Sequence, residues 1–90
     1  MRMRAVHVDP LARFSLEVDD DTGLTYLGIP VRNTMVEYTE WYLVDRDTFA
    51  TFVVHPSAAW SMVQRARRRE IDHLLLLPPG RDRGVADHPE

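Results

Sequence analysis

A strictly alternating run at residues 12–18, Ala-Arg-Phe-Ser-Leu-Glu-Val, constrains the fold of this chain more than any other feature. Alternation with a period of two puts the apolar side chains on one face and is the pattern of a half-buried β-strand. Three aspartates, a threonine and Gly23 follow, and acidic turn formers before a glycine favour a tight turn. Residues 24–31 predict the returning strand, with Pro30 at a strand end or a sheet edge because proline has no N–H for a ladder. The segment therefore predicts an antiparallel hairpin.

Residues 35–44 predict a third antiparallel strand, because they are rich in β-branched and aromatic side chains. One face of this strand carries Val36, Tyr38, Glu40, Tyr42 and Val44. The other face carries Met35, Glu37, Thr39, Trp41 and Leu43. Both faces are substantially apolar, as expected for a central strand or one that is covered on both sides. Residues 1–10 alternate loosely and are a candidate for a further edge strand.

Two helices are expected after the third strand. Two aspartates are candidate N-caps for residues 46–54, where apolar side chains recur at i, i+3 and i+4 and favour a short helix. The β-branched residues of this segment would also suit a strand, and the sequence leaves that alternative open. A proline then interrupts the helix, because the residue before proline disfavours helical dihedrals. A second helix with one apolar stripe is predicted from Pro56 or Ser57 to Glu70.

The last apolar segment, residues 71–77, ends at two prolines. It could extend the helix, but a short apolar run between breakers favours a buried strand. Residues 80–90 are polar and predict a flexible C-terminal tail, which leaves a single domain over residues 1–79. The order β-β-β-α-α-β implies a two-layer α+β domain, in which two helices back an antiparallel sheet of about four strands.

Composition removes several classes of chemistry. The 90 residues include no cysteine, and all 11 basic residues are arginine, so disulfides, thiolate metal sites, Schiff-base lysines and P-loops are excluded. The sequence contains neither the apolar segment of a secretory signal nor a run long enough to span a membrane, so a cytoplasmic protein is expected.

The formal net charge of −3 is unevenly divided. Residues 1–55 carry nine acids and five arginines, for −4, whereas residues 56–90 carry five acids and six arginines, for +1. Neither half has the basic footprint of a nucleic-acid-binding domain. The acidic half would instead attract a basic protein surface.

Catalytic patterns are weak. Glu37 and Glu40 are three apart on a strand, so they point to opposite faces and cannot flank one scissile bond. No histidine pair has metal-ligand spacing, and the aspartate run lacks the pattern of a calcium loop. We therefore expect no catalytic residue, no metal and no cofactor. Catalytic triads are assembled in space, so a small ligand-binding or hydrolase-like domain stays open, with His55 and the tyrosines as its candidate groups.

The basic run near the end of the second helix defines an alternative function. Arg65, Arg68 and Arg69 are the candidate phosphate contacts of a nucleic-acid-associated accessory protein. No helix-turn-helix, RRM or KH motif accompanies them, and cations also stabilise the last turn of a helix. A solvated helix end is the favoured interpretation, so nucleic acid is not the expected partner.

The aromatic residues of the third strand favour a protein interface. Two helices can cover one face of the sheet, and an exposed aromatic patch on the other face is typical of an interface. The candidate partner-binding residues are Glu37, Tyr38, Glu40, Trp41 and Tyr42. We expect self-association through residues 35–44 first and a heterologous protein partner second. The leading hypothesis is a small non-enzymatic interaction module, one form of which is an inhibitor or immunity-type protein that binds a basic partner.

Overall fold

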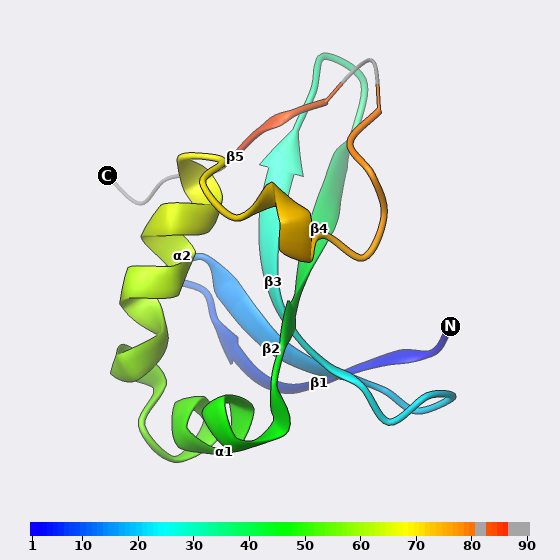
Figure 1. The fold of residues 1–90 in the computed structure, drawn as a ribbon. Coiled ribbons are helices and arrows are strands. Elements are labelled where there is room, and N and C mark those ends of the chain that lie inside the picture. The colour runs from blue at the N-terminus through cyan, green and yellow to red at the C-terminus, as the bar shows by residue number, and fades with distance from the viewer. Residues whose placement is uncertain (81–82, 87–90) are drawn as a thin grey trace.

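The computed structural model describes residues 1–80 and 83–86 (Figure 1). In this part of the chain, five strands form one antiparallel sheet and two α-helices pack on it, an α+β fold that is not closed into a barrel. The strands are β1 (Met3–Asp9), β2 (Phe14–Asp19), β3 (Thr25–Arg32), β4 (Glu37–Val44) and β5 (Val85–Ala86). The helices are α1 (Arg46–Val54) and α2 (Trp60–Arg67), with 3₁₀ turns η1 (Pro56–Ala59) and η2 (Asp72–Leu74). The predicted fold class and meander are confirmed, and β1 is the further edge strand.

Two strands share one edge of β3. β4 pairs with the whole length of β3 on one side, while β2 pairs with residues 25–28 and β5 with the last two residues on the other side. Pro30 lies between these two partners. The main-chain groups of successive residues in a strand point to opposite edges. Leu24, just before β3, points its carbonyl at the β2 edge, where it accepts from Asp19 N. The even-numbered residues of β3 therefore point their main-chain groups at the same edge. The missing N–H of Pro30 therefore falls where the edge has no partner.

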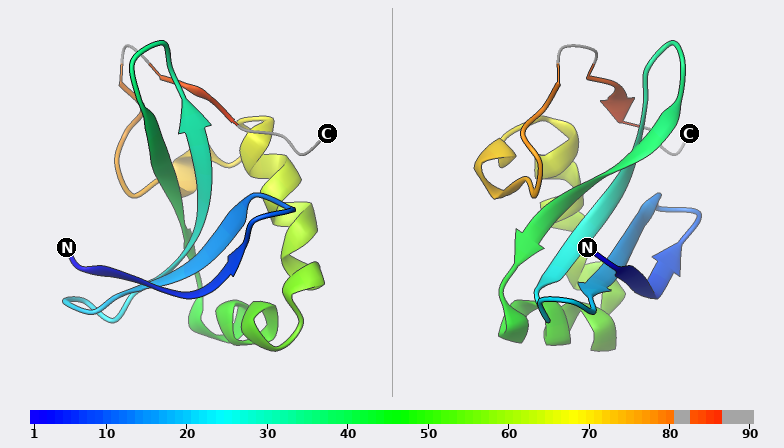
Figure 2. Two further views of the ribbon diagram at one scale, coloured as in Figure 1. Left: turned by 180° about the vertical axis from the view of Figure 1, so that it is seen from behind. Right: turned by 90° about the vertical axis from the view of Figure 1, so that its right-hand side faces the viewer.

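Both helices lie on one side of the sheet (Figure 2). The core fills the space between the sheet and the helices. The alternating residues of β2 and the even-numbered residues of β4 point into this core, as their periodicity predicts. The fully buried side chains include Leu16, Leu27, Ile29, Val31, Tyr42 and Ile71.

The segment over residues 46–54 is the helix α1, which settles the helix-or-strand alternative. Asp45 caps it: the carboxylate accepts one hydrogen bond from Thr48 N and one from Thr48 Oγ1, both 2.9 Å long. An aspartate in this position satisfies a main-chain donor that the first turn leaves without a partner. Phe49 and Phe52 then point into the core.

The second helix is shorter than predicted. It starts as the 3₁₀ turn η1 and its α-helical part ends at Arg67 rather than Glu70. Arg69 adopts a φ of 60°, in the left-handed region that terminates helices. The reversal carries Ile71 into the core, where its side chain is 1% exposed.

The strand predicted over residues 71–77 is wrong. Residues 72–74 form η2, and pairing with β4 is limited to one bridge between Leu75 and Tyr42. Leu76 N donates to Trp41 O at 2.9 Å, and the two prolines that follow lack the N–H groups needed to extend the ladder.

Residues 81–82 and 87–90 of the predicted flexible tail lie outside the described residues. Within the described remainder, Val85 and Ala86 form β5 and Arg83 is 10% exposed. Gly84 passes so close to Arg32 that an added Cβ would lie 2.6 Å from the carbonyl carbon of Arg32. A flexible tail over residues 80–90 stays a prediction.

Candidate functional site

The face of the sheet turned away from α1 and α2 carries a compact polar cluster. We call this the outer face; the strand register places there Ser15 and Glu17 of β2, Tyr26 and Gly28 of β3, and Thr39, Trp41 and Leu43 of β4. Gly28 pairs with Ser15 on one side and with Trp41 on the other, so side chains from three strands meet above it.

Glu17 is the centre of this cluster. Its Oε2 accepts a 2.7 Å hydrogen bond from Ser15 Oγ and a 2.9 Å hydrogen bond from Trp41 Nε1. An added Cβ on Gly28 would lie 2.6 Å from Ser15 Oγ and 2.7 Å from Glu17 Oε2. The cluster therefore requires glycine at position 28.

The charge of Glu17 has no cationic partner among the described residues. Both of its hydrogen-bond donors are neutral, and its side chain is half-buried. Glu37, at the far end of the same face, differs: its carboxylate pairs with Arg13 at 3.3 Å and with Arg32 at 3.1 Å. Partial burial of a carboxylate without a counter-ion is unfavourable, so Glu17 is the position on this face where an added cation would be stabilised most.

The five residues predicted to bind a partner do not form one surface. Glu37 and Trp41 lie on the outer face, whereas Tyr38, Glu40 and Tyr42 point to the helix side. Glu40 is 8% exposed and the Tyr42 side chain is fully buried. Contact with a partner is therefore open to Glu37 and Trp41, while Glu40 and Tyr42 belong to the interior.

Glu40 belongs to a buried ion cluster with Arg83. Arg83 Nε and Nη2 donate to the two oxygens of Glu40 at 2.8 and 3.1 Å, and Nη1 and Nη2 donate to Asp72 at 2.7 and 2.9 Å. Hydrogen bonds from Arg83 lower the pKa of Asp72, and the two carboxylates raise the pKa of Arg83. Burial, followed by the charge of Glu40, raises the pKa of Tyr42, which keeps its hydroxyl as a donor to Glu40 at 3.0 Å. The cluster attaches Arg83 to β4 and to η2.

The candidate phosphate contacts are also dispersed. Arg69 Nη2 donates to the Gly84 carbonyl at 2.9 Å, and Arg68 Nε pairs with Glu70 at 2.5 Å. Arg65 is exposed on α2. Two of the three arginines thus have partners within the chain, which weakens the nucleic-acid alternative.

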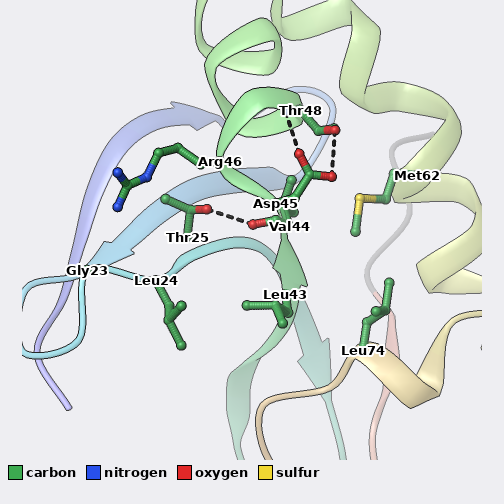
Figure 3. A pocket seen from close by; sticks show the side chains of 10 residues that line it. All are labelled: Gly23, Leu24, Thr25, Leu43, Val44, Asp45, Arg46, Thr48, Met62 and Leu74. Carbon is green, nitrogen blue, oxygen red and sulfur yellow. Dashed lines mark hydrogen bonds between the residues drawn. The ribbon is translucent and has the colours of Figure 1, made fainter.

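A hollow of about 470 Å³ lies at the end of β4 (Figure 3). Leu24 and Leu43 lie on one side of the strand and Met62 and Leu74 on the other. Two of its polar groups have partners, since Thr25 Oγ1 donates to Val44 O at 2.7 Å and the Asp45 carboxylate caps α1, and Arg46 also lines it. The hollow therefore offers mainly apolar contact.

The described residues hold no group of three side chains that could bind a metal ion. His55 is exposed at the end of α1, and Tyr26, which lies on the outer face, is 2% exposed with a pKa raised by burial. These groups do not converge on one hollow. Within the described ranges, no helix has the length and apolar character needed to cross a membrane.

Sequence reasoning missed Glu17, Ser15 and Arg83. Ser15 and Glu17 occupy the polar positions of the first alternating run, which marks them as outer-face residues. Their proximity to Trp41 depends on the register of three strands, and Arg83 lies 43 positions from Glu40, so no local pattern signals either contact.

Comparisons of the chain with protein-family models, with curated protein sequences and with solved structures each find no match.

Proposed function

We propose that this chain is a small non-enzymatic interaction module that binds a basic protein through the outer face of its sheet. The observation that carries the proposal is the half-buried carboxylate of Glu17, which has two neutral donors, no cationic partner among the described residues, and the indole of Trp41 beside it. A cation brought by a partner would meet a negative charge that no described cation compensates.

The charge distribution supports the same proposal. Residues 1–55, which contain β1 to β4, carry a net charge of −4. A net negative charge accelerates encounter with a basic partner, and the effect weakens as salt screens the charges. An inhibitor or immunity role, in which the module covers a basic toxin or nuclease, is the form of this function that the acidity favours.

The test measures affinity for three peptides of equal length, rich in lysine, in arginine or in glutamate, at low and at high salt. We expect both basic peptides to bind, with an affinity that falls as salt rises, and the acidic peptide not to bind. Glu17→Gln should weaken the binding of the basic peptides. The matched control is Glu70→Gln, which removes an exposed carboxylate paired with Arg68 far along the chain. Failure of both basic peptides to bind better than the acidic one would contradict the proposal.

Self-association is the second candidate, and a separate observation favours it. Leu24 and Leu43 are 48% and 41% exposed and border the apolar hollow at the end of β4 (Figure 3). A second copy could cover these side chains, since exposed apolar patches are typical of interfaces.

A further inference from the structure

We propose that the site formed by Glu17 and Trp41 binds the ammonium group of a lysine side chain in preference to the guanidinium of an arginine, an inference that rests on the proposed function. The hydrogen bonds already present decide between the two cations. Glu17 Oε2 accepts from Ser15 Oγ at 2.7 Å and from Trp41 Nε1 at 2.9 Å. A carboxylate oxygen has two lone pairs, so the remaining capacity of Glu17 lies on Oε1.

Arginine binds carboxylates well because two parallel N–H groups reach both oxygens. The chain itself provides the comparison: Arg83 Nε and Nη2 contact separate oxygens of Glu40 at 2.8 and 3.1 Å. The same two-pronged contact at Glu17 would displace a donor from Oε2. An ammonium group is a compact donor that needs Oε1 alone and leaves the bonds from Ser15 and Trp41 in place.

The surroundings of the carboxylate suit a lysine. Ser15 Oγ uses its hydrogen on Glu17 and keeps its lone pairs for a second N–H of the ammonium. Trp41 holds the other carboxylate oxygen through its indole N–H and so fixes the carboxylate for a cation that binds Oε1.

Glu37, the other carboxylate of the outer face, does not compete with Glu17 for an added cation. Glu37 already has Arg13 and Arg32 as partners, so its carboxylate is compensated within the chain. Glu37 and Trp41 are four positions apart on β4, which is about 13 Å along a strand and exceeds the screening length of about 10 Å at 0.1 M salt. The two ends of the face therefore act independently.

The test follows the indole N–H of Trp41 by heteronuclear NMR in the full chain carrying Trp60→Phe. Trp60 is 55% exposed on α2, so this change leaves a single indole signal without altering the core. The titrants are the peptide Gly-Ser-Lys-Lys-Lys-Ser-Gly, its arginine counterpart and its lysine-acetylated form. We expect the lysine peptide to shift the signal and to bind about tenfold more tightly than the arginine peptide, the equivalent of one charge-assisted hydrogen bond. The acetylated peptide should leave the signal unchanged.

Glu17→Gln should abolish the preference for lysine, and Glu70→Gln should preserve it. Equal or tighter binding of the arginine peptide would overturn the preference for ammonium and leave the proposed function standing. An indole signal that moves with neither basic peptide would overturn both.

Discussion

Arg83 and Glu40 form two parallel hydrogen bonds, 2.8 and 3.1 Å long, in which both side chains are nearly excluded from solvent. The pair joins a residue near the end of the described chain to the middle of β4. Asp72 accepts two further hydrogen bonds from the same guanidinium. Arg83 therefore compensates the charge of Glu40, which is buried in the sheet.

Arg83→Gln is expected to lower the free energy of unfolding by about 3 kcal/mol, because it leaves the charge of Glu40 buried without a partner. Urea unfolding followed by circular dichroism measures this change. Arg68→Gln is the control, since its ion pair with Glu70 is exposed and is expected to contribute less than about 1 kcal/mol. The double variant Arg83→Gln with Glu40→Gln should recover part of the loss; equal stability of the single and double variants would contradict a role for the buried charge.

Stability is expected to fall in acid partly through Asp19. Main-chain N–H groups of Arg2 and Asp21 donate to its carboxylate at 3.1 and 3.0 Å and hold its pKa below the ordinary value of 3.8. The unfolded chain therefore takes up this proton at a higher pH than the folded chain. The contribution of Asp19 is present above about pH 4 and is lost as the pH falls through the lower folded pKa.

The measurement is the free energy of unfolding in urea as a function of pH, for the wild type and Asp19→Asn. The variant should lose less stability on acidification than the wild type below about pH 4. Other carboxyl groups with lowered pKa values, those of Asp20, Asp45 and Asp72, continue to titrate in the variant. The dependence of its free energy of unfolding on pH should therefore become weaker without vanishing. Identical slopes would show that Asp19 is not linked to folding.

The N-cap of α1 provides a local test of the fold. Asp45→Ala removes both hydrogen bonds to Thr48 and should cost about 1 kcal/mol of stability. Asp47→Ala, two positions along in the first turn, is the control, because Asp45 rather than Asp47 accepts the capping bonds from Thr48. A shift of the urea midpoint in the control as large as that in Asp45→Ala would argue against the cap.

Gly28→Ala should disrupt the polar cluster of the outer face. The added methyl group would lie 2.6 Å from Ser15 Oγ and 2.7 Å from Glu17 Oε2, so the side chains must move apart, at a cost of about 1–3 kcal/mol. The indole N–H signal of Trp41 should shift even without a ligand, because its acceptor moves. Gly80→Ala, where an added Cβ meets no atom within 4 Å, is the matched control. An unchanged indole signal in Gly28→Ala would contradict the described packing.

Sedimentation equilibrium tests self-association. If residues 35–44 form a dimer interface, the apparent mass should rise with concentration, and Leu43→Asp should restore the monomer mass because a charge would be buried in the interface. Val54→Asp is the control, since Val54 is also exposed but lies on α1. A monomer mass at all concentrations, or dissociation by the control alone, would exclude this interface.

The sequence predicts local features of this fold well. Alternation in β2 and β4 places Leu16 and Tyr42 in the core, and α1 has its predicted bounds. These features depend on residues within a few positions of one another, because hydrophobic periodicity and helix capping are local properties of the sequence. The shortened helix shows the limit: tertiary packing of Ile71 outweighs the local preference to continue past Arg67.

The candidate site is harder to predict because it depends on register. Glu17 and Trp41 are 24 positions apart. Their contact depends on the register in which Gly28 of β3 pairs with Ser15 of β2 on one side and with Trp41 of β4 on the other. A slip of one residue in either pairing would send Glu17 or Trp41 to the opposite face. The same reasoning applies to Glu40. Its buried charge is compensated by Arg83, and no local sequence pattern predicts that pairing.

The two strands that share one edge of β3 also make the residues from Arg83 onward important for the rest of the sheet. A chain cleaved before Arg83 would keep β1 to β4 and both helices but would lose β5 and the counter-ion of Glu40. It would present an unpaired strand edge at Val31 and Arg32 and a buried carboxylate without its arginine. Open strand edges pair readily with other chains. Proteolysis at this place is therefore expected to promote misassembly as well as to shorten the protein.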